Sequence, residues 1–138
     1  MSNILLAVDG SDNSYRAAEE CIKYAACMEA SRVQLIYVAD FAKAKNEVLH
    51  AGGRDQLEAA RRKRLAPVEA LLQEKQIPYE VHILHGDPAP VIVEFANEQK
   101  PDLVVVGSRG LNSLQEMVLG SVSHKVVKRV QAPVLVVK

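Results

Sequence analysis

The sequence predicts a single-domain, three-layer α/β/α sandwich with helices on both faces of a five-stranded parallel sheet. Three observations lead to this fold class. Short apolar segments alternate along the chain with longer segments of helical periodicity. The apolar segments, such as residues 103–106, show no polar alternation, as expected of parallel strands that are covered on both faces. A length of 138 residues suits one domain, residues 1–138, with a substantial core.

The first strand is expected at residues 3–8, which are short and apolar. Residues 11–14 (Ser-Asp-Asn-Ser) favour helix N-caps, so a helix is predicted to begin there and to end near residues 30–31. Its apolar stripe consists of small residues, which allow a helix to lie close to a sheet. Cys21 and Cys27 both fall on this helix and are interpreted as structural thiols.

The middle of the chain predicts a second strand at residues 33–38, a helix at 55–75 and a third strand at 79–84. The intervening residues 41–53 have mixed polarity and end in two glycines. They are interpreted as a loop, and a partly helical segment is the alternative. Pro67 lies inside the second helix and is expected to kink or restart it.

The last third of the chain adds two strands and two helices. Asp87 as N-cap and Pro88 as first helical residue predict a helix start. The fourth strand is expected at 103–106, a last helix at Gly120-Ser121 with Ser121 able to cap it, and the fifth strand at Val134–Val137.

In the expected strand order 3-2-1-4-5, the first and fourth strands flank the point where the order reverses. Ligands of such sheets bind beyond the carboxyl ends of the strands at that point. These two ends carry residues 9–11 (Asp-Gly-Ser) and 107–110 (Gly-Ser-Arg-Gly). Two polar turns that contain glycine are therefore expected to converge there.

The second of these turns begins a glycine pattern, Gly107-x2-Gly110-x9-Gly120-Ser121. Glycine allows a close approach of backbone to a ligand, and the free N–H groups at a helix start suit a phosphate. The segment is therefore a candidate phosphate cradle. The alternative is that the glycines only shape turns and that Ser121 only caps a helix.

This pattern resembles the nucleotide-binding signature of the universal stress proteins, in the subgroup that binds ATP. The resemblance covers essentially the whole chain. Residues 7–11 (Ala-Val-Asp-Gly-Ser) are similar to the opening motif of the family, and residues 85–88 (His-Gly-Asp-Pro) to its turn after the third strand. Residues 132–137 (Ala-Pro-Val-Leu-Val-Val) are similar to its last strand.

The resemblance implies a Rossmann-like nucleotide-binding fold and a set of site residues. Ala7 and Val38 match positions that line the adenine, and Asp9 matches the acidic position beside the ribose and metal region. Asp9 accepts from a ribose hydroxyl or holds Mg²⁺ through water, and Arg109 is a phosphate ligand or an exposed loop residue. The full nucleotide-binding set comprises Ala7, Val8, Asp9, Val38, Gly107, Ser108, Arg109, Gly110, Gly120, Ser121, Val122 and Ser123. No residue is assigned a catalytic or metal-ligating role.

As function, the resemblance implies an ATP-binding regulatory module of the stress response, with AMP or ADP as alternative ligands and Mg²⁺ on the phosphates. Little or no ATPase activity is expected, because the sequence offers no convincing set of hydrolytic groups. The ordering of residues 111–119 by ATP would present a changed surface to an unknown protein partner. The family also implies a homodimer through Val134–Val137, an apolar strand at a predicted sheet edge. A slow Mg²⁺-dependent ATP hydrolase and a nucleotide-free interaction module are the alternatives.

Other function classes are disfavoured. Seventeen basic and 17 acidic residues cancel, so no overall field draws nucleic acid or anionic lipid. The basic run at residues 61–64 spreads around a helix and is interpreted as a solvated surface. The first apolar segment is too short for a signal peptide or a membrane span, which predicts a cytoplasmic protein. Neither a P-loop nor a dinucleotide fingerprint occurs, and His85 and His124 are interpreted as surface residues.

Overall fold

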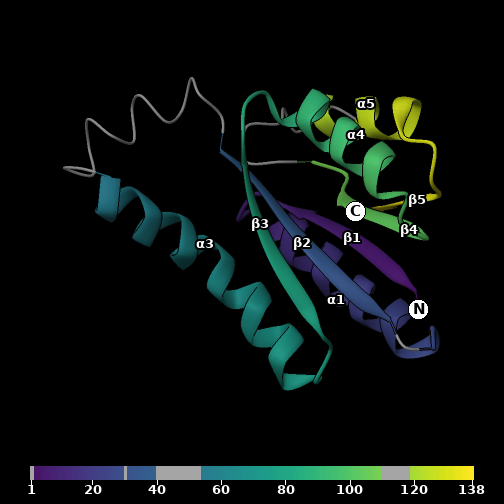
Figure 1. Cartoon of the computed structure of the whole chain (residues 1–138), viewed down its shortest axis with the longest axis horizontal. Coiled ribbons are helices and arrows are strands. Elements are labelled where there is room, and N and C mark those ends of the chain that lie inside the picture. The colour runs from purple at the N-terminus through teal and green to yellow at the C-terminus, as the bar shows by residue number, and fades with distance from the viewer. Residues whose placement is uncertain (1, 30, 40–53, 110–118) are drawn as a thin grey trace.

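The computed structural model describes residues 2–29, 31–39, 54–109 and 119–138. The expected loop at 41–53, Gly110 and the segment 111–118 lie outside these ranges. Strands and helices alternate along the chain (Figure 1). The strands are β1 (Asn3–Val8), β2 (Arg32–Ala39), β3 (Tyr79–His85), β4 (Leu103–Gly107) and β5 (Val134–Val137). The helices are α1 (Asp12–Cys27), α3 (Arg54–Glu74), α4 (Pro88–Gln99) and α5 (Ser121–Arg129).

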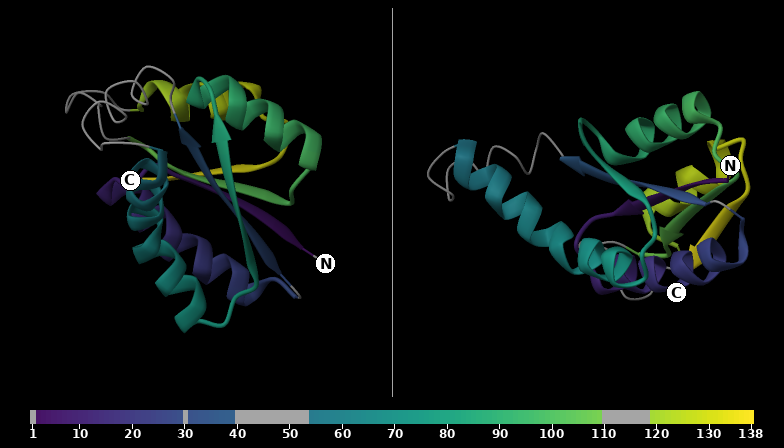
Figure 2. Two further views of the ribbon diagram at one scale, coloured as in Figure 1. Left: turned by 60° about the vertical axis from the view of Figure 1, so that its left-hand side comes forward. Right: turned by 60° about the horizontal axis from the view of Figure 1, so that its bottom comes forward.

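The strands form a five-stranded parallel sheet in the order β3-β2-β1-β4-β5. Ile4 of β1 lies opposite Val33 of β2 on one side and opposite Leu103 of β4 on the other. Helices α1 and α3 cover one face of the sheet, and α4 and α5 cover the other (Figure 2). The predicted fold class and strand order are confirmed.

Both faces of the sheet are apolar because both are covered. Along β1, Ile4 and Leu6 belong to the core beneath α1 and α3, whereas Leu5 belongs to the core beneath α4 and α5. All three side chains are fully buried. The unbroken apolar strands of the sequence follow directly from this two-sided burial.

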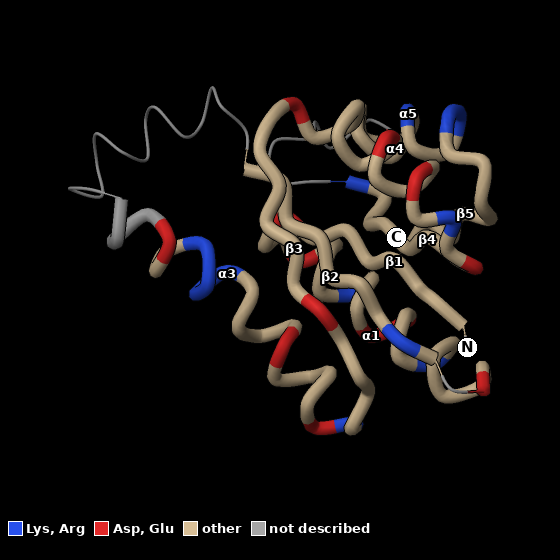
Figure 3. The backbone as a smooth tube through the Cα atoms, viewed as in Figure 1, with Lys and Arg blue, Asp and Glu red and all other residues tan. Residues whose placement is uncertain are grey.

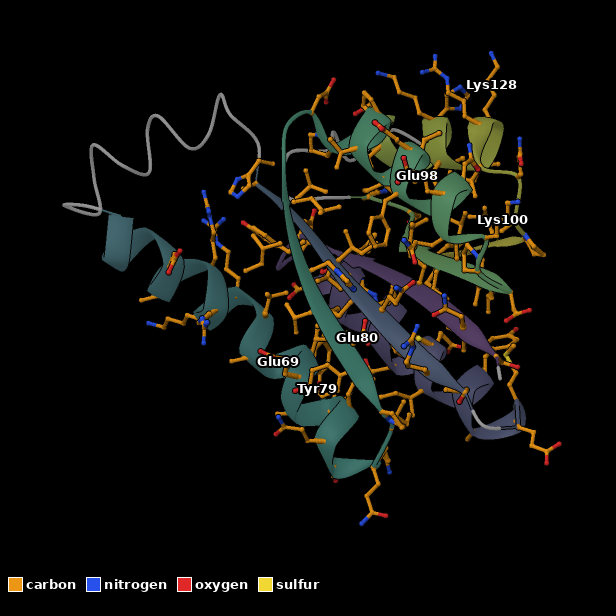
Figure 4. All side chains as sticks on the ribbon, in the orientation of Figure 1. Glu69, Tyr79, Glu80, Glu98, Lys100 and Lys128 are labelled. Carbon is orange, nitrogen blue, oxygen red and sulfur yellow. The ribbon has the colours of Figure 1, made fainter. Side chains whose placement is uncertain are left out.

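Helix α3 continues through Pro67 as one element, so the alternative that the helix restarts at this proline was wrong. Pro67 lies on the exposed side, where water can satisfy the carbonyl group that loses its helical partner. The far end of α3 is fixed to the edge strand: the Tyr79 hydroxyl donates to Glu69 Oε1 at 3.1 Å and accepts from Gln73 Nε2 at 2.8 Å (Figure 4). Helix α1 ends at Cys27, slightly earlier than expected.

The basic run at residues 61–64 lies on α3, where Figure 3 colours it blue. Only part of it is a solvated surface. Arg62 and Lys63 are exposed, but Arg61 is 7% exposed, because it lies one turn before the buried Leu65 on the same helix face. Arg64 donates through Nη1 to the hydroxyl of Tyr37 at 2.9 Å. The interpretation of all four cations as surface residues was therefore wrong for Arg61.

The two cysteines are free and differ in environment, Cys21 being buried and Cys27 exposed. Burial raises the pKa of the Cys21 thiol to about 12. Over the described ranges, none of the helices has the length and apolar character needed to cross a membrane.

Candidate functional site

The turns that follow β1 and β4 lie together, as the strand order predicts. Asn13, in the first turn of α1, donates from Nδ2 to Ser108 Oγ at 3.1 Å. The backbone of Asn13 lies directly against Gly107, the last residue of β4. The described parts of the two predicted turns therefore form one region at the carboxyl edge of the sheet.

The turn after β1 is held by its own polar groups. Asp9 Oδ1 accepts from the Ser11 amide at 2.9 Å, and Ser11 Oγ accepts from the Ser14 amide at 3.2 Å as the N-cap of α1. Gly10 has a φ of +86°, and an ideal Cβ at this position would lie 3.3 Å from Cβ of Arg64. Glycine is favoured here because its φ lies in the left-handed region and because the residue packs against Arg64 of α3.

The turn after β4 is joined to the start of α5 by two hydrogen bonds to a single carbonyl group. The Ser108 carbonyl accepts from the Gly120 amide at 2.7 Å and from the Ser123 hydroxyl at 2.9 Å. The same hydroxyl lies 3.0 Å from the Gly120 carbonyl oxygen. Ser108 and Ser123 are both buried, so these bonds form an internal link between segments that are distant in sequence.

Helix α5 begins one residue earlier than the capping prediction implied. Gly120 is the N-cap, with φ −68° and ψ 163°, and Ser121 is the first helical residue. The first backbone bond of the helix runs from the His124 amide to the Gly120 carbonyl at 3.0 Å. The amides of residues 121–123 therefore precede the helical hydrogen bonds, and such amides attract anions. Of the described residues, those in this first turn include no acidic side chain.

The surroundings of Gly107 and Gly120 differ in whether they leave space for a side chain. An ideal Cβ on Gly107 would lie 3.0 Å from the backbone carbon and 3.1 Å from the oxygen of Asn13, which is tight enough that the Asn13 backbone would have to shift. An ideal Cβ on Gly120 would lie 3.4 Å from Ser108 O and from Arg109 Cα, which is normal contact. With its negative φ, Gly120 is thus not required by backbone strain or by its described neighbours.

The whole sequence, residues 1–138, matches the profile of the universal stress protein family. The chain belongs to the universal stress protein family. One relative, universal stress protein MJ0531 of Methanocaldococcus jannaschii, is 36% identical over 98% of this chain and 81% of its own length.

Solved structures of the family agree with the fold of this universal stress protein. The structure of MJ0577 from the same archaeon superposes with a TM-score of 0.85 at 28% identity, covering 99% of this chain and 95% of the other. A universal stress protein in complex with cAMP gives a TM-score of 0.69 at 26% identity, covering 99% and 96%.

The remaining predicted site residues of this universal stress protein divide between the two sheet faces. Ala7 and the half-buried Val38 belong to the core beneath α4 and α5, and Val122 packs against the same core. Val8 lies on the opposite face, in the core beneath α1 and α3. Arg109 is exposed immediately after the buried Ser108.

Two residues at this site of the universal stress protein escaped the sequence reasoning. Asn13 was interpreted only as part of a capping cluster, and Arg16 was not singled out. The structure connects both of them to the turn after β4, through Asn13 Nδ2 and through a bond from Arg16 Nη2 to Asn13 Oδ1. No local signal predicts the link to the turn after β4, because Ser108 lies far from Asn13 in the sequence. Among the described residues, no group of three or more His, Cys, Asp or Glu side chains could hold a metal ion.

Proposed function

We propose that this protein binds an adenine nucleotide at the carboxyl ends of β1 and β4, with its phosphates against the first turn of α5. The observation that carries the proposal is Gly120. No described neighbour and no backbone angle requires a glycine there, yet a Cβ would occupy the space beside Ser108 and Arg109. A phosphate that approaches the backbone at this point accounts for the missing side chain.

The hydrogen bonds distinguish amides of the glycine pattern that bond within the protein from amides that remain for a phosphate. The amides of Ser108 and Gly120 are already bonded within the protein, to Val137 O and Ser108 O respectively. The amides of residues 121–123 and the exposed hydroxyl of Ser121 are the groups that we assign to the phosphates. Gly107, Ser108 and Ser123 then shape the cradle, and the exposed Arg109 lies at its rim.

We assign the base and the ribose to the β1 and β2 side of the site. Ala7 and Val38 share one sheet face near the ends of their strands and offer an apolar surface to a flat base. Val8 supports this end of β1 from the opposite face. Asp9 stands at the β1 turn, where one carboxylate oxygen already accepts from the Ser11 amide and the carboxylate suits a ribose hydroxyl. The family member solved in complex with cAMP supports an adenine nucleotide as the ligand.

The ligand that we propose is ATP, with Mg²⁺ held mainly by its phosphates; AMP and ADP are the alternatives. Since the cradle presents backbone amides, it favours anionic groups in proportion to their charge. The protein then acts as a nucleotide-dependent regulatory module of the stress response. Turnover requires a base or a group that orients water, and we assign the carboxylate of Asp9 to turn structure and ribose instead.

The proposal is tested by calorimetric titration of the purified protein with ATP, AMP, adenosine and GTP, each with and without Mg²⁺. We expect ATP to bind at least about tenfold more tightly than adenosine, since adenosine lacks the anionic groups. GTP is expected to bind more weakly than ATP. No binding of ATP at concentrations on the order of 1 mM would overturn the proposal and leave the interaction-module alternative.

A phosphate-release assay distinguishes binding from slow hydrolysis. We expect no release above that of a heat-denatured sample over hours with ATP and Mg²⁺. Release in the native protein that disappears in Gly120→Val, with the fold retained, would instead assign a slow hydrolase to this site.

We further propose a homodimer through β5. This strand ends the sheet order and pairs with β4 on one side, and three of its four residues are only half-buried. A partner strand would complete both the burial and the hydrogen bonds of this edge. Sedimentation velocity should give twice the chain mass of 15.1 kDa. A monomer at all concentrations up to about 100 µM would contradict the proposal.

A further inference from the structure

A closed ring of hydrogen bonds joins the turn after β4, the end of β5 and the first turn of α1. The Ser108 amide donates to Val137 O at 2.7 Å, and Arg16 Nε donates to the main-chain oxygen of the next residue, Lys138, at 3.2 Å. Arg16 Nη2 donates to Asn13 Oδ1, and Asn13 Nδ2 returns to Ser108 Oγ at 3.1 Å. Five residues from three elements thus hold one another in place.

The ring acts on the candidate site through Ser108. Its carbonyl oxygen accepts hydrogen bonds from both the Gly120 amide and the Ser123 hydroxyl, and these two bonds fix the start of α5. A shift of Ser108 therefore shifts the amides of α5 relative to the turn. Because hydrogen bonds weaken steeply with poor alignment, small displacements of this frame matter for any ligand that binds several amides at once.

We propose that Arg16 and Asn13 are positioning residues for the phosphate cradle, although neither belongs to the glycine pattern. This inference rests on the proposed nucleotide function. The guanidinium of Arg16 is suited to the role because its planar fork donates to two acceptors at once, Lys138 O and Asn13 Oδ1. As a consequence, a change in the position of the chain after β5 should change the affinity for the nucleotide.

The decisive variant is Arg16→Lys, which keeps the positive charge and removes the two-sided fork. We expect ATP affinity to fall about three- to tenfold while adenosine affinity is unchanged, because only the phosphate contacts depend on the ring. In the ligand-free protein, the amides of Ser108 and Gly120 should exchange with solvent several-fold faster by NMR. Lys23→Met is the matched control: Lys23 lies on the same helix, is exposed, and pairs locally with Glu20 at 2.8 Å.

The two measurements separate the possible failures. Unchanged exchange at Ser108 and Gly120 in Arg16→Lys would overturn the ring as a positioning device, whatever the ligand. Faster exchange with wild-type ATP affinity, or an equal loss for adenosine and ATP, would overturn its role toward the phosphates. A wild-type protein that binds no ATP would overturn the proposed function, and with it the positioning of a ligand, while the exchange data would still report the ring.

Discussion

Gly107 and Gly120 belong to one sequence pattern, but the structure gives them opposite explanations. A side chain at Gly107 would be crowded, because the backbone of Asn13 lies against this glycine. Gly120 has room among its described neighbours and an ordinary backbone angle, so we propose that its missing side chain serves a ligand rather than the fold. A glycine in a binding motif is therefore not by itself evidence of a ligand contact; the space around its Cβ position must decide.

The largest effect is expected from Gly107→Ala. The added Cβ must displace the first turn of α1, which we expect to lower the free energy of unfolding by about 1–3 kcal/mol. Urea denaturation followed by circular dichroism measures this change. An unchanged midpoint would remove the packing explanation for Gly107 and return this glycine to the set of ligand contacts.

Gly120→Ala should show the reverse pattern. The free energy of unfolding is expected to change by less than about 1 kcal/mol, because the new Cβ makes only ordinary contacts. ATP affinity should fall at least about tenfold, equivalent to about 1.4 kcal/mol, as the methyl group enters the cradle. Calorimetric titration beside the urea experiment gives both values, and full ATP affinity in a folded variant would refute the cradle.

Ser123→Ala tests the hydroxyl group that links the turn after β4 to the first turn of α5. The buried hydroxyl bonds Ser108 O and Gly120 O, so its loss should reduce stability by about 1–2 kcal/mol. The urea midpoint reports this directly. A loss of ATP affinity without any loss of stability would mean that Ser123 serves the ligand rather than the frame.

The smallest effect is expected from Ser121→Ala at the adjoining exposed position. Stability should stay within about 0.5 kcal/mol, since the side chain lies on the surface at the first helical residue. ATP affinity should fall about two- to fivefold through the loss of one hydroxyl contact. If calorimetry finds ATP binding unchanged, the phosphates contact only the backbone at this residue.

The sequence predicted the fold well because its signals were local. Apolar runs without alternation marked strands, and the capping residues 11–14 marked the start of α1 with Ser11 as its N-cap. The burial of Arg61 was missed, because charge alone does not show which side of a helix faces the sheet. Likewise, Asp87 holds the N-cap position of α4 as predicted, but its side chain makes no capping hydrogen bond.

The sequence predicted the two turns of the candidate site, but it did not predict the contacts between them. Asn13 and Arg16 belong to no recognised motif, and their partners Ser108 and Lys138 lie just after β4 and β5. Only the strand order brings these segments together, so their pairing is a tertiary property. The same limit applies to Ser108 and Gly120, whose amides belong to the frame although the pattern alone suggested phosphate donors.

The contrast between Cys21 and Cys27 gives the protein a natural attachment point for a probe. Burial raises the pKa of the Cys21 thiol to about 12, so at pH 8 it is ionised far less than an exposed thiol, and burial also shields it from reagents. The exposed Cys27 lies at the last residue of α1, the helix whose first turn carries Asn13. A fluorophore coupled there without any mutagenesis would report, at one end of the helix, on movements that begin at the other.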